Sequence, residues 1–149
     1  MPPQLNTPVA KKLLNSTIPA RLAFVGISGQ PHITPIWFLW RNGTIVMASR
    51  ANAAKVRAMK ANPRIALTID SEEPPYKVLR IRGRANIEII NGVVDEYVIC
   101  AHRYYGKSIG DKWLAGLRDP ELQMARITVT PDWAEAADFE ERFPHLYDD

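Results

Sequence analysis

The chain has 149 residues, of which 46% are hydrophobic and 23% charged, as in an ordinary globular protein. This length suits a single domain, residues 1–149, that can bury a core of its own. No apolar run approaches the roughly 20 residues that cross a bilayer, which excludes a membrane-spanning helix. The single cysteine, Cys100, excludes an internal disulfide, and no secretory signal is visible, so we expect a cytoplasmic protein.

The net charge is only +3, but positive and negative residues are unevenly distributed along the chain. Residues 1–69 hold nine Lys and Arg and no Asp or Glu, whereas residues 131–149 hold seven acids and one Arg. A basic half of this kind favours an anionic partner, which could be a nucleic acid, a phosphate ester or a membrane surface. The alternative is that the acidic tail packs against basic residues of its own or a neighbouring subunit.

The first half of the chain predicts one short helix and three strands. The helix follows Thr7, a good N-cap residue, and has Pro8 at its first position. Asn42-Gly43, between two apolar runs, is a strong hairpin signal because both residues tolerate positive φ. We expect the three strands to form an antiparallel meander. The helix and the strands are expected over residues 9–14, 20–27, 31–40 and 44–48.

The second half predicts three further helices and three further strands. Residues 49–62 have a helical pattern that stops before Pro63. Residues 76–89 alternate between apolar and polar positions, as a strand with one buried face does. The remaining elements are strands at 64–69 and 124–129, helices at 93–105 and 111–117, a loop at 106–110 and an acidic tail at 131–149. Six strands with few, short helices favour an antiparallel barrel whose core spans about residues 20–130.

A candidate ligand site lies between residues 31 and 55. Pro35-Ile36-Trp37 offers backbone groups and a flat apolar wall for a planar ring, and Pro35 places this part of the strand at an edge or an irregularity. Ser49, Arg50 and Lys55 put a hydroxyl, a guanidinium and an ammonium at a predicted helix start, which suits a phosphate. No acid nearby neutralises these cations. The alternative is a core or interface role for the aromatic residues and a capped helix with solvated charges.

No catalytic side chain and no metal site is expected. The three histidines lack the spacing of metal ligands, and the nucleophile-elbow, Walker and Rossmann motifs are absent. Cys100 is expected to be a buried, inert thiol. Arg82 and Arg84 are expected on a solvated or inter-subunit face, or paired with acids of the tail, and Arg80 is left open. An enzyme with this sequence would therefore take its reactive group from a cofactor.

Five segments, in this order and spacing, resemble the pyridoxamine 5'-phosphate oxidase-like split-barrel superfamily. The likeness is closer to the branch that uses flavin mononucleotide (FMN) or the deazaflavin coenzyme F-420, and it covers about residues 20–89. The resemblance implies a six-stranded antiparallel split β-barrel and a homodimer with two cofactor sites at the subunit interface. The segments are residues 29–38, Asn42-Gly43, Ser49 with residues 54–57, residues 62–67 and residues 79–85.

The resemblance also assigns the candidate residues to parts of the cofactor. The second strand would lie along the tricyclic ring, and the residues after the third strand would hold the phosphate. The implied ring contacts are Thr34, Pro35, Ile36 and Trp37, and the implied phosphate contacts are Ser49, Arg50 and Lys55. Ala54 and Arg80 complete the expected cofactor-binding set.

Three departures separate this chain from the true pyridoxamine 5'-phosphate oxidases. Thr34 stands where they carry Arg, and Val78 stands where they carry Gln before the Arg-Ile pair. Their C-terminal substrate-binding Arg motif is not recognisable either, which argues against oxidation of vitamin B6. Ala54-Lys55 and Pro35-Ile36-Trp37-Phe38 look more like the deazaflavin branch, so the deazaflavin coenzyme is placed slightly ahead of FMN.

Three functions fit these observations. The preferred one is an oxidoreductase that transfers a hydride between a flavin or deazaflavin and a small organic substrate. The second is a non-catalytic FMN-binding carrier or sensor, with a pyridoxamine 5'-phosphate oxidase as a weaker alternative. The third is a barrel that binds a polyanion through its basic half, and it ranks last because we expect no nucleic-acid partner.

Overall fold

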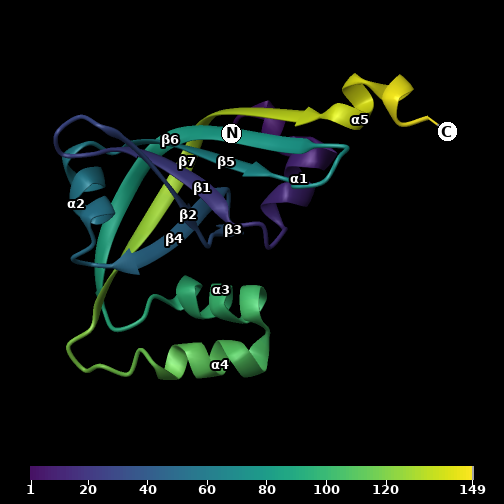
Figure 1. Ribbon diagram of the computed structural model, residues 1–149. Helices are drawn as coiled ribbons and strands as arrows, with labels where there is room; N and C mark the ends of the chain where they lie inside the picture. The colour runs from purple at the N-terminus through teal and green to yellow at the C-terminus, as the bar shows by residue number, and fades with distance from the viewer. Residues whose placement is uncertain (149) are drawn as a thin grey trace.

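The structure, a computed structural model, describes residues 1–148 and contains a seven-stranded antiparallel sheet (Figure 1). The strand order is β2-β1-β5-β6-β7-β4-β3, and the sheet forms an open, split barrel rather than a closed one. The predicted fold class, mainly β with peripheral helices, is confirmed. The strands are β1 (Ala20–Val25), β2 (Pro31–Ile36), β3 (Leu39–Arg41), β4 (Thr44–Arg50), β5 (Arg64–Asp70), β6 (Lys77–Asn91) and β7 (Gln123–Asp138).

The helices lie around the sheet (Figure 1). α3 (Asp95–Tyr105) and α4 (Lys107–Ala115) form a hairpin on one side of the barrel, inserted in the chain between β6 and β7. α5 (Phe139–Arg142) follows β7 and extends past the sheet. The other helical segments are α1 (Pro8–Leu14), α2 (Ala54–Ala61) and two 3-10 turns, Pro3–Asn6 and Pro144–Leu146.

Apolar side chains from the strands, with α1 and α2, fill the barrel interior. β6 alternates as predicted, since Leu79 and Ile81 are buried while Arg80 and Arg82 are exposed. Thr7 caps α1 as predicted, because its hydroxyl oxygen accepts a hydrogen bond from a backbone amide of the helix. Large side chains that are fully buried include Leu22, Phe38, Ile45, Met47, Met59, Leu67, Ile69 and Ile127.

The strand predicted over residues 31–40 is two strands, β2 and β3, at opposite edges of the sheet. β2 pairs with β1 and β3 pairs with β4, so both hairpins exist but the predicted meander is wrong. The chain breaks at Trp37-Phe38, where Phe38 enters the core and Trp37 packs against α3. Pro35 lies on an edge strand, as its missing N–H predicts. This break explains why the barrel has seven strands instead of six.

The helix predicted over residues 49–62 begins only at Ala54. Ser49 and Arg50 continue β4, because both are paired with residues of β7. Ala53 is the N-cap residue, and its side chain makes no capping hydrogen bond. The predicted helix start at Ser49 is therefore wrong, because pairing with the long strand β7 outweighs the local helix signal.

The connection between α3 and α4 is much shorter than the predicted loop at residues 106–110. It consists of Gly106, whose φ of 80° lets the chain reverse and enter α4 at once. The two helices therefore fold back on each other within a single residue. This tight reversal brings the aromatic side chains of both helices to the same side of the barrel.

The acidic tail predicted from residue 131 onward begins as part of the barrel. β7 continues to Asp138 because it pairs with β6 along nearly its whole length. Three tail acids pair with cations of β6: Asp138 and Glu140 lie 3.2 Å and 3.7 Å from Lys77, and Glu135 pairs with Arg80. The tail thus neutralises basic residues of the second half of the chain. Arg21 and Arg41, in the first half, pair instead with acids outside the tail, Asp70 and Glu96.

A bulge interrupts the pairing of β6 with β7. Arg82 is paired with Trp133 and Gly83 with Pro131, which leaves Asp132 as the extra residue on β7. A bulge redirects the side chains around it and increases the local twist. It also brings the two backbones so close at Gly83 that no side chain fits there.

Replacing Gly83 by alanine should lower the free energy of unfolding by about 2 kcal/mol, because the core has no room to adjust. A Cβ at this position would lie 2.8 Å from the Thr130 carbonyl oxygen and 2.8 Å from Val129 Cγ1. Urea unfolding measures the loss. Gly116→Ala, at a helix end with ordinary backbone angles, is the control and should stay within about 0.5 kcal/mol of the wild type. Equal losses in the two variants would contradict the steric account.

Candidate functional site

A groove runs between β2, β4 and the α3–α4 hairpin. It consists of two adjoining hollows, of about 310 Å³ and about 620 Å³, that share Ala48, Tyr97 and Trp113. We call it the β2–β4 groove. The smaller hollow is also lined by Pro35, Ile36 and Trp37, and the larger one by Ser49 and Arg50. The structure therefore brings the predicted ring wall and part of the predicted phosphate site to one continuous depression.

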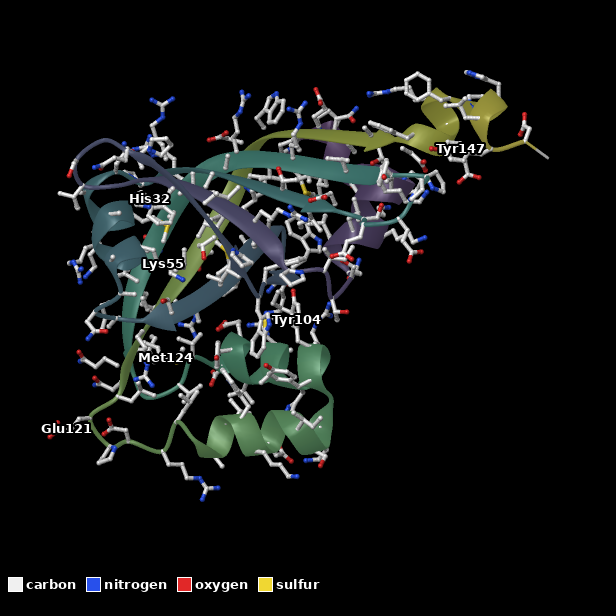
Figure 2. All side chains as sticks on the ribbon, viewed as in Figure 1. His32, Lys55, Tyr104, Glu121, Met124 and Tyr147 are labelled. Atoms are coloured by element: carbon white, nitrogen blue, oxygen red, sulfur yellow. The ribbon has the colours of Figure 1, made fainter. Side chains whose placement is uncertain are left out.

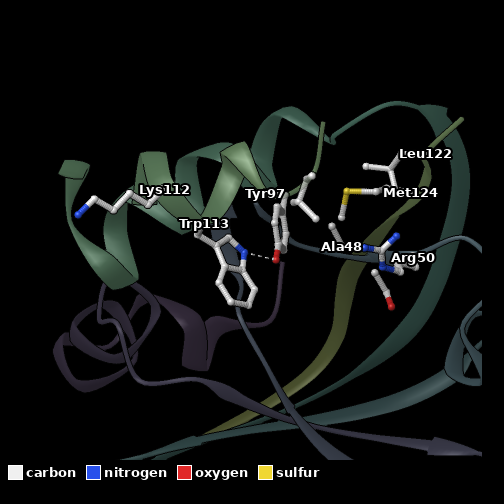
Figure 3. A pocket seen from close by; sticks show the side chains of 10 residues that line it. Ala48, Arg50, Tyr97, Lys112, Trp113, Leu122 and Met124 are labelled. Atoms are coloured by element: carbon white, nitrogen blue, oxygen red, sulfur yellow. Dashed lines mark hydrogen bonds between the residues drawn. The ribbon is translucent and has the colours of Figure 1, made fainter. Parts of the chain in front are cut away.

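An aromatic cluster forms one wall of the β2–β4 groove, with Trp37 at its centre. The Trp37 ring stacks on Tyr104 at 5.2 Å between centroids and 17° between planes. It also contacts Tyr97 at 5.5 Å, Tyr105 at 5.3 Å and Trp113 at 6.0 Å. Trp113 Nε1 donates a hydrogen bond of 2.8 Å to the Tyr97 hydroxyl, drawn as a dashed line in Figure 3. The wall is thus held by ring contacts from two helices.

Tyr104 ties α3 to the break between β2 and β3 (Figure 2). Its hydroxyl accepts a hydrogen bond from the Phe38 amide at 3.4 Å and donates one to the Ile18 carbonyl at 3.5 Å. Burial raises the pKa of Tyr104 to about 12, and burial also raises the pKa of Tyr97. Both phenols are therefore neutral near pH 7, and the wall is uncharged.

A buried carboxylate, Glu96, fastens α3 to the barrel beside Tyr97. Its two oxygens accept hydrogen bonds from Arg41 on β3 and Arg126 on β7, both at 2.9 Å. Arg126 also binds Glu88 of β6 at 3.0 Å. Burial alone would raise the pKa of Glu96, but the hydrogen bond and charge of Arg126, helped by Arg41, lower it. Glu96 therefore stays ionised and positions the helix that carries the wall.

The predicted cationic residues are only partly brought together in the structure. Ser49 and Arg50 line the β2–β4 groove from the end of β4 (Figure 3). The Ala53 amide donates a 3.1 Å hydrogen bond to the Arg50 carbonyl, which places the start of α2 directly after the groove. Ala54 and Lys55 lie in the first turn of α2 and do not line the groove. Lys55, which Figure 2 labels, is half-buried, and burial lowers its pKa.

The other two predicted residues lie outside the groove. Thr34 lines a neighbouring hollow of about 430 Å³, which the groove meets at Pro35. Arg80 is on the outer face of β6, where it pairs with Glu135 of β7. The structure therefore does not bring Arg80 to the other predicted residues.

Residues 7–131 match the family model described as pyridoxamine 5'-phosphate oxidase. The chain belongs to this family. The family expected from the sequence is thereby confirmed. No curated protein matches the sequence.

Several solved structures share the fold of this chain. An F-420 reductase is 24% identical, with a TM-score of 0.70 over 84% of this chain and 94% of that chain. A conserved hypothetical protein from Mycobacterium tuberculosis is 18% identical, with a TM-score of 0.68 over 88% of this chain and 83% of that chain. An FAD-binding protein from Mesorhizobium loti is 19% identical, with a TM-score of 0.56 over 85% of this chain and 89% of that chain. These likenesses establish the fold.

For a member of the pyridoxamine 5'-phosphate oxidase family, the chemistry of the β2–β4 groove fits a phosphorylated ring. One part is apolar and aromatic, and the other carries a hydroxyl and a guanidinium. Among the described residues that line it, none is an acid, so an anionic ligand meets no opposing carboxylate. A drug-sized ligand needs a hollow of roughly 300–1,000 Å³, which the two parts supply.

The remaining chemical candidates of the sequence lie away from the groove. Cys100 is buried, as predicted, and burial raises its pKa to about 11, so it is a thiol at neutral pH. In the described part of the chain, no three His, Cys, Asp or Glu side chains gather as metal ligands would. No helix of residues 1–148 is both long and apolar enough to cross a membrane.

The sequence did not indicate Tyr97, Tyr104 and Trp113 as site residues. The helix that carries the two tyrosines was predicted. Which of its faces packs against the barrel depends on the contacts of Glu96 with Arg41 and Arg126, which are 55 and 30 residues away from it in sequence. The position of Trp113 depends on the reversal at Gly106, which was read as the start of a loop. The unusual concentration of aromatic residues in 97–113 was the available signal.

Proposed function

We propose that the protein binds a flavin or deazaflavin cofactor in the β2–β4 groove and transfers a hydride between it and a small organic substrate. The observation that carries the proposal is the groove itself, an aromatic wall around Trp37 that continues into Ser49 and Arg50 with no acid along it. The family assignment supports a phosphorylated cofactor. The F-420 reductase among the similar structures supports the preference for the deazaflavin coenzyme over FMN.

The proposed roles follow from position along the groove. Pro35, Ile36 and Trp37 would lie along the ring, and Thr34 would extend this contact into the neighbouring hollow. Ser49 and Arg50 would bind the phosphate, and the start of α2 would complete the grip through Ala54 and Lys55. The first amides of a helix have no partner within the helix, and its dipole favours an anion there.

A homodimer belongs to the same proposal. Three large apolar side chains beside the groove are exposed, namely Tyr105 (44%), Ile109 (56%) and Trp113 (46%). Large exposed apolar groups close together are typical of protein–protein or ligand contacts. A partner subunit over this edge would cover them and close the cofactor site. Arg80, which faces outward on β6, would then contact the cofactor of the partner subunit.

The protein's contribution to the reaction would be binding and orientation. The bound cofactor supplies the hydride chemistry. Trp37 and its aromatic neighbours would fix the plane of the ring and exclude water from its face, while Arg50 would anchor the phosphate and set the ring's position along the groove. Tyr97 and Tyr104 keep their protons at neutral pH, so neither acts as a base.

Turnover with the reduced cofactor tests the activity. The purified protein is mixed with reduced FMN or reduced coenzyme F-420 and a panel of small unsaturated organic compounds under anaerobic conditions. Protein-dependent oxidation of the cofactor, followed by absorbance, is the expected result. Tight binding without turnover of any compound would favour the non-catalytic carrier or sensor.

Lys55→Met separates the cofactor role of Lys55 from a structural one. Burial lowers the pKa of Lys55, which means that its charged form is disfavoured in the fold. Methionine keeps the apolar stem and removes that cost, so the thermal midpoint should stay level or rise. Cofactor affinity, measured by titration, should nevertheless fall by about tenfold because a phosphate contact is lost. Unchanged affinity would remove Lys55 from the proposed site.

A further inference from the structure

We propose that the outer face of β1, β5 and β6 carries a second binding site, which takes a small phosphate-containing anion. The site is a groove of about 410 Å³ that shares no lining residue with the β2–β4 groove. We call it the arginine groove, after Arg64, Arg82 and Arg84, which line it. This inference goes beyond the proposed function and does not depend on it.

The arrangement of the arginines in this groove lowers the stability of the sheet. Arg64 on β5 lies directly opposite Arg84 on β6 in the pairing register. Like charges at opposed positions, roughly 4.5–5.5 Å apart at Cβ, destabilise a sheet. In residues 1–148, none of the three arginines forms an ion pair with an acid, whereas Arg80 on the same face does. An anion bound between Arg64 and Arg84 would remove the repulsion.

The bulge between β6 and β7 fixes the position of the third arginine, Arg82. It places Trp133 opposite Arg82, and the Arg82 guanidinium lies 4.1 Å from the centroid of the Trp133 ring. A guanidinium held against an aromatic face loses little freedom when it binds an anion. The same bulge leaves Asp132 as the extra residue, and Asp132 is the one acid among the described residues that line the groove.

The shape of the groove fits a small ligand. Ala23 and Ala66, on neighbouring strands, have small side chains that leave space above the sheet between the arginines. His32 stands at the rim with its ring stacked on Phe24, at 5.1 Å and 8°. Three guanidinium groups against one carboxylate favour a ligand with about two negative charges. Guanidinium groups bind phosphate oxygens through paired hydrogen bonds, which points to a phosphate or pyrophosphate group.

Calorimetric titration of the intact protein with inorganic pyrophosphate tests the proposal. The wild type should bind, and Arg84→Gln should bind at least about tenfold more weakly, because one charge-assisted contact is lost. Arg118→Gln removes an exposed arginine outside the groove and should bind like the wild type. A wild type that does not bind, or equal losses in the two variants, would overturn the proposal.

Arg64→Glu gives a second test that does not rely on the folding of the first variant. The new carboxylate would face Arg84 across the strands, so the opposed pair becomes attractive and the thermal midpoint should rise. Pyrophosphate binding should be lost, because the groove then contains a second acid. A variant that folds and still binds pyrophosphate with wild-type affinity would contradict the assignment.

Two sources of the phosphate are distinguished by repeating the titration with saturating FMN. If the groove takes a phosphate group of the cofactor, FMN should weaken pyrophosphate binding. If the groove takes a separate phosphorylated compound, the pyrophosphate affinity should be unchanged. Both results retain the arginine groove as an anion site and decide which ligand fills it.

Discussion

Replacing Arg50 by alanine is expected to weaken cofactor binding about 100-fold and to change the free energy of unfolding by less than about 0.5 kcal/mol. Arg50 is exposed at the end of β4, and no acid in the described chain pairs with it. The fold therefore gains little from its charge. A phosphate held by the guanidinium would lose a bidentate contact at the cation that follows Ser49 directly in the lining of the β2–β4 groove.

The titration should use FMN and coenzyme F-420 against the wild type, Arg50→Ala and a control. Arg118→Ala removes the same charge from an exposed position outside the β2–β4 groove, so it corrects for the change in net charge. Urea unfolding of all three proteins checks the fold. A loss of affinity that is the same in both variants would mean that overall charge, and not the geometry of the groove, attracts the cofactor.

Replacing Glu96 by glutamine should cost about 2 kcal/mol of stability at pH 7, as large an effect on the fold as we expect for Gly83→Ala. Glu96 is only 7% exposed, and its carboxylate accepts hydrogen bonds from two arginines. Glutamine keeps the shape but leaves both guanidinium groups without a charge partner at this point. Glu88→Gln is the matched control and should cost less than about 0.5 kcal/mol, because Glu88 is mostly exposed.

The pH dependence gives the Glu96 prediction a second readout. Its pKa in the fold is lower than the ordinary value of 4.5, so the carboxylate contributes stability that is complete above about pH 4.5. That contribution is lost as the pH falls through the lowered pKa, because the protonated group resembles glutamine. The stability difference between wild type and Glu96→Gln should therefore shrink below pH 4.5. A difference that is constant from pH 7 to pH 3 would contradict the role of the charge.

The parts of the fold that local patterns specify were predicted well. β6 was recognised because its alternation continues over a long run, and the β3–β4 hairpin because Asn42-Gly43 encodes the turn. Pro35 indicated an edge because a missing N–H is a local property. The residues of the predicted ring wall line the same groove as Ser49 and Arg50, and their role in cofactor binding stays a prediction.

The parts that failed depend on contacts distant in sequence. The apolar run breaks at Trp37-Phe38 because its two halves pair with different strands, the first with β1 and the second with β4. Ser49 was predicted at the start of a helix, but in the structure it pairs with β7. The position of Glu96 depends on its ion pairs with Arg41 and Arg126, and no local sequence pattern predicts contacts between residues so far apart. For the same reason the aromatic wall around Trp37 was invisible before α3 and α4 were folded onto the barrel.

Resonances of the four tryptophan indole N–H groups during a cofactor titration test the central claim most directly. Trp37 and Trp113 line the β2–β4 groove, whereas Trp133 lies on the outer face of β7 beside Arg82. Single Trp→Phe variants assign the signals. Saturation with coenzyme F-420 or FMN should shift the Trp37 and Trp113 signals most. If both signals stay unchanged at saturation, the groove is not the cofactor site. The same conclusion follows if neither cofactor binds to about 10 μM protein at roughly 100-fold excess.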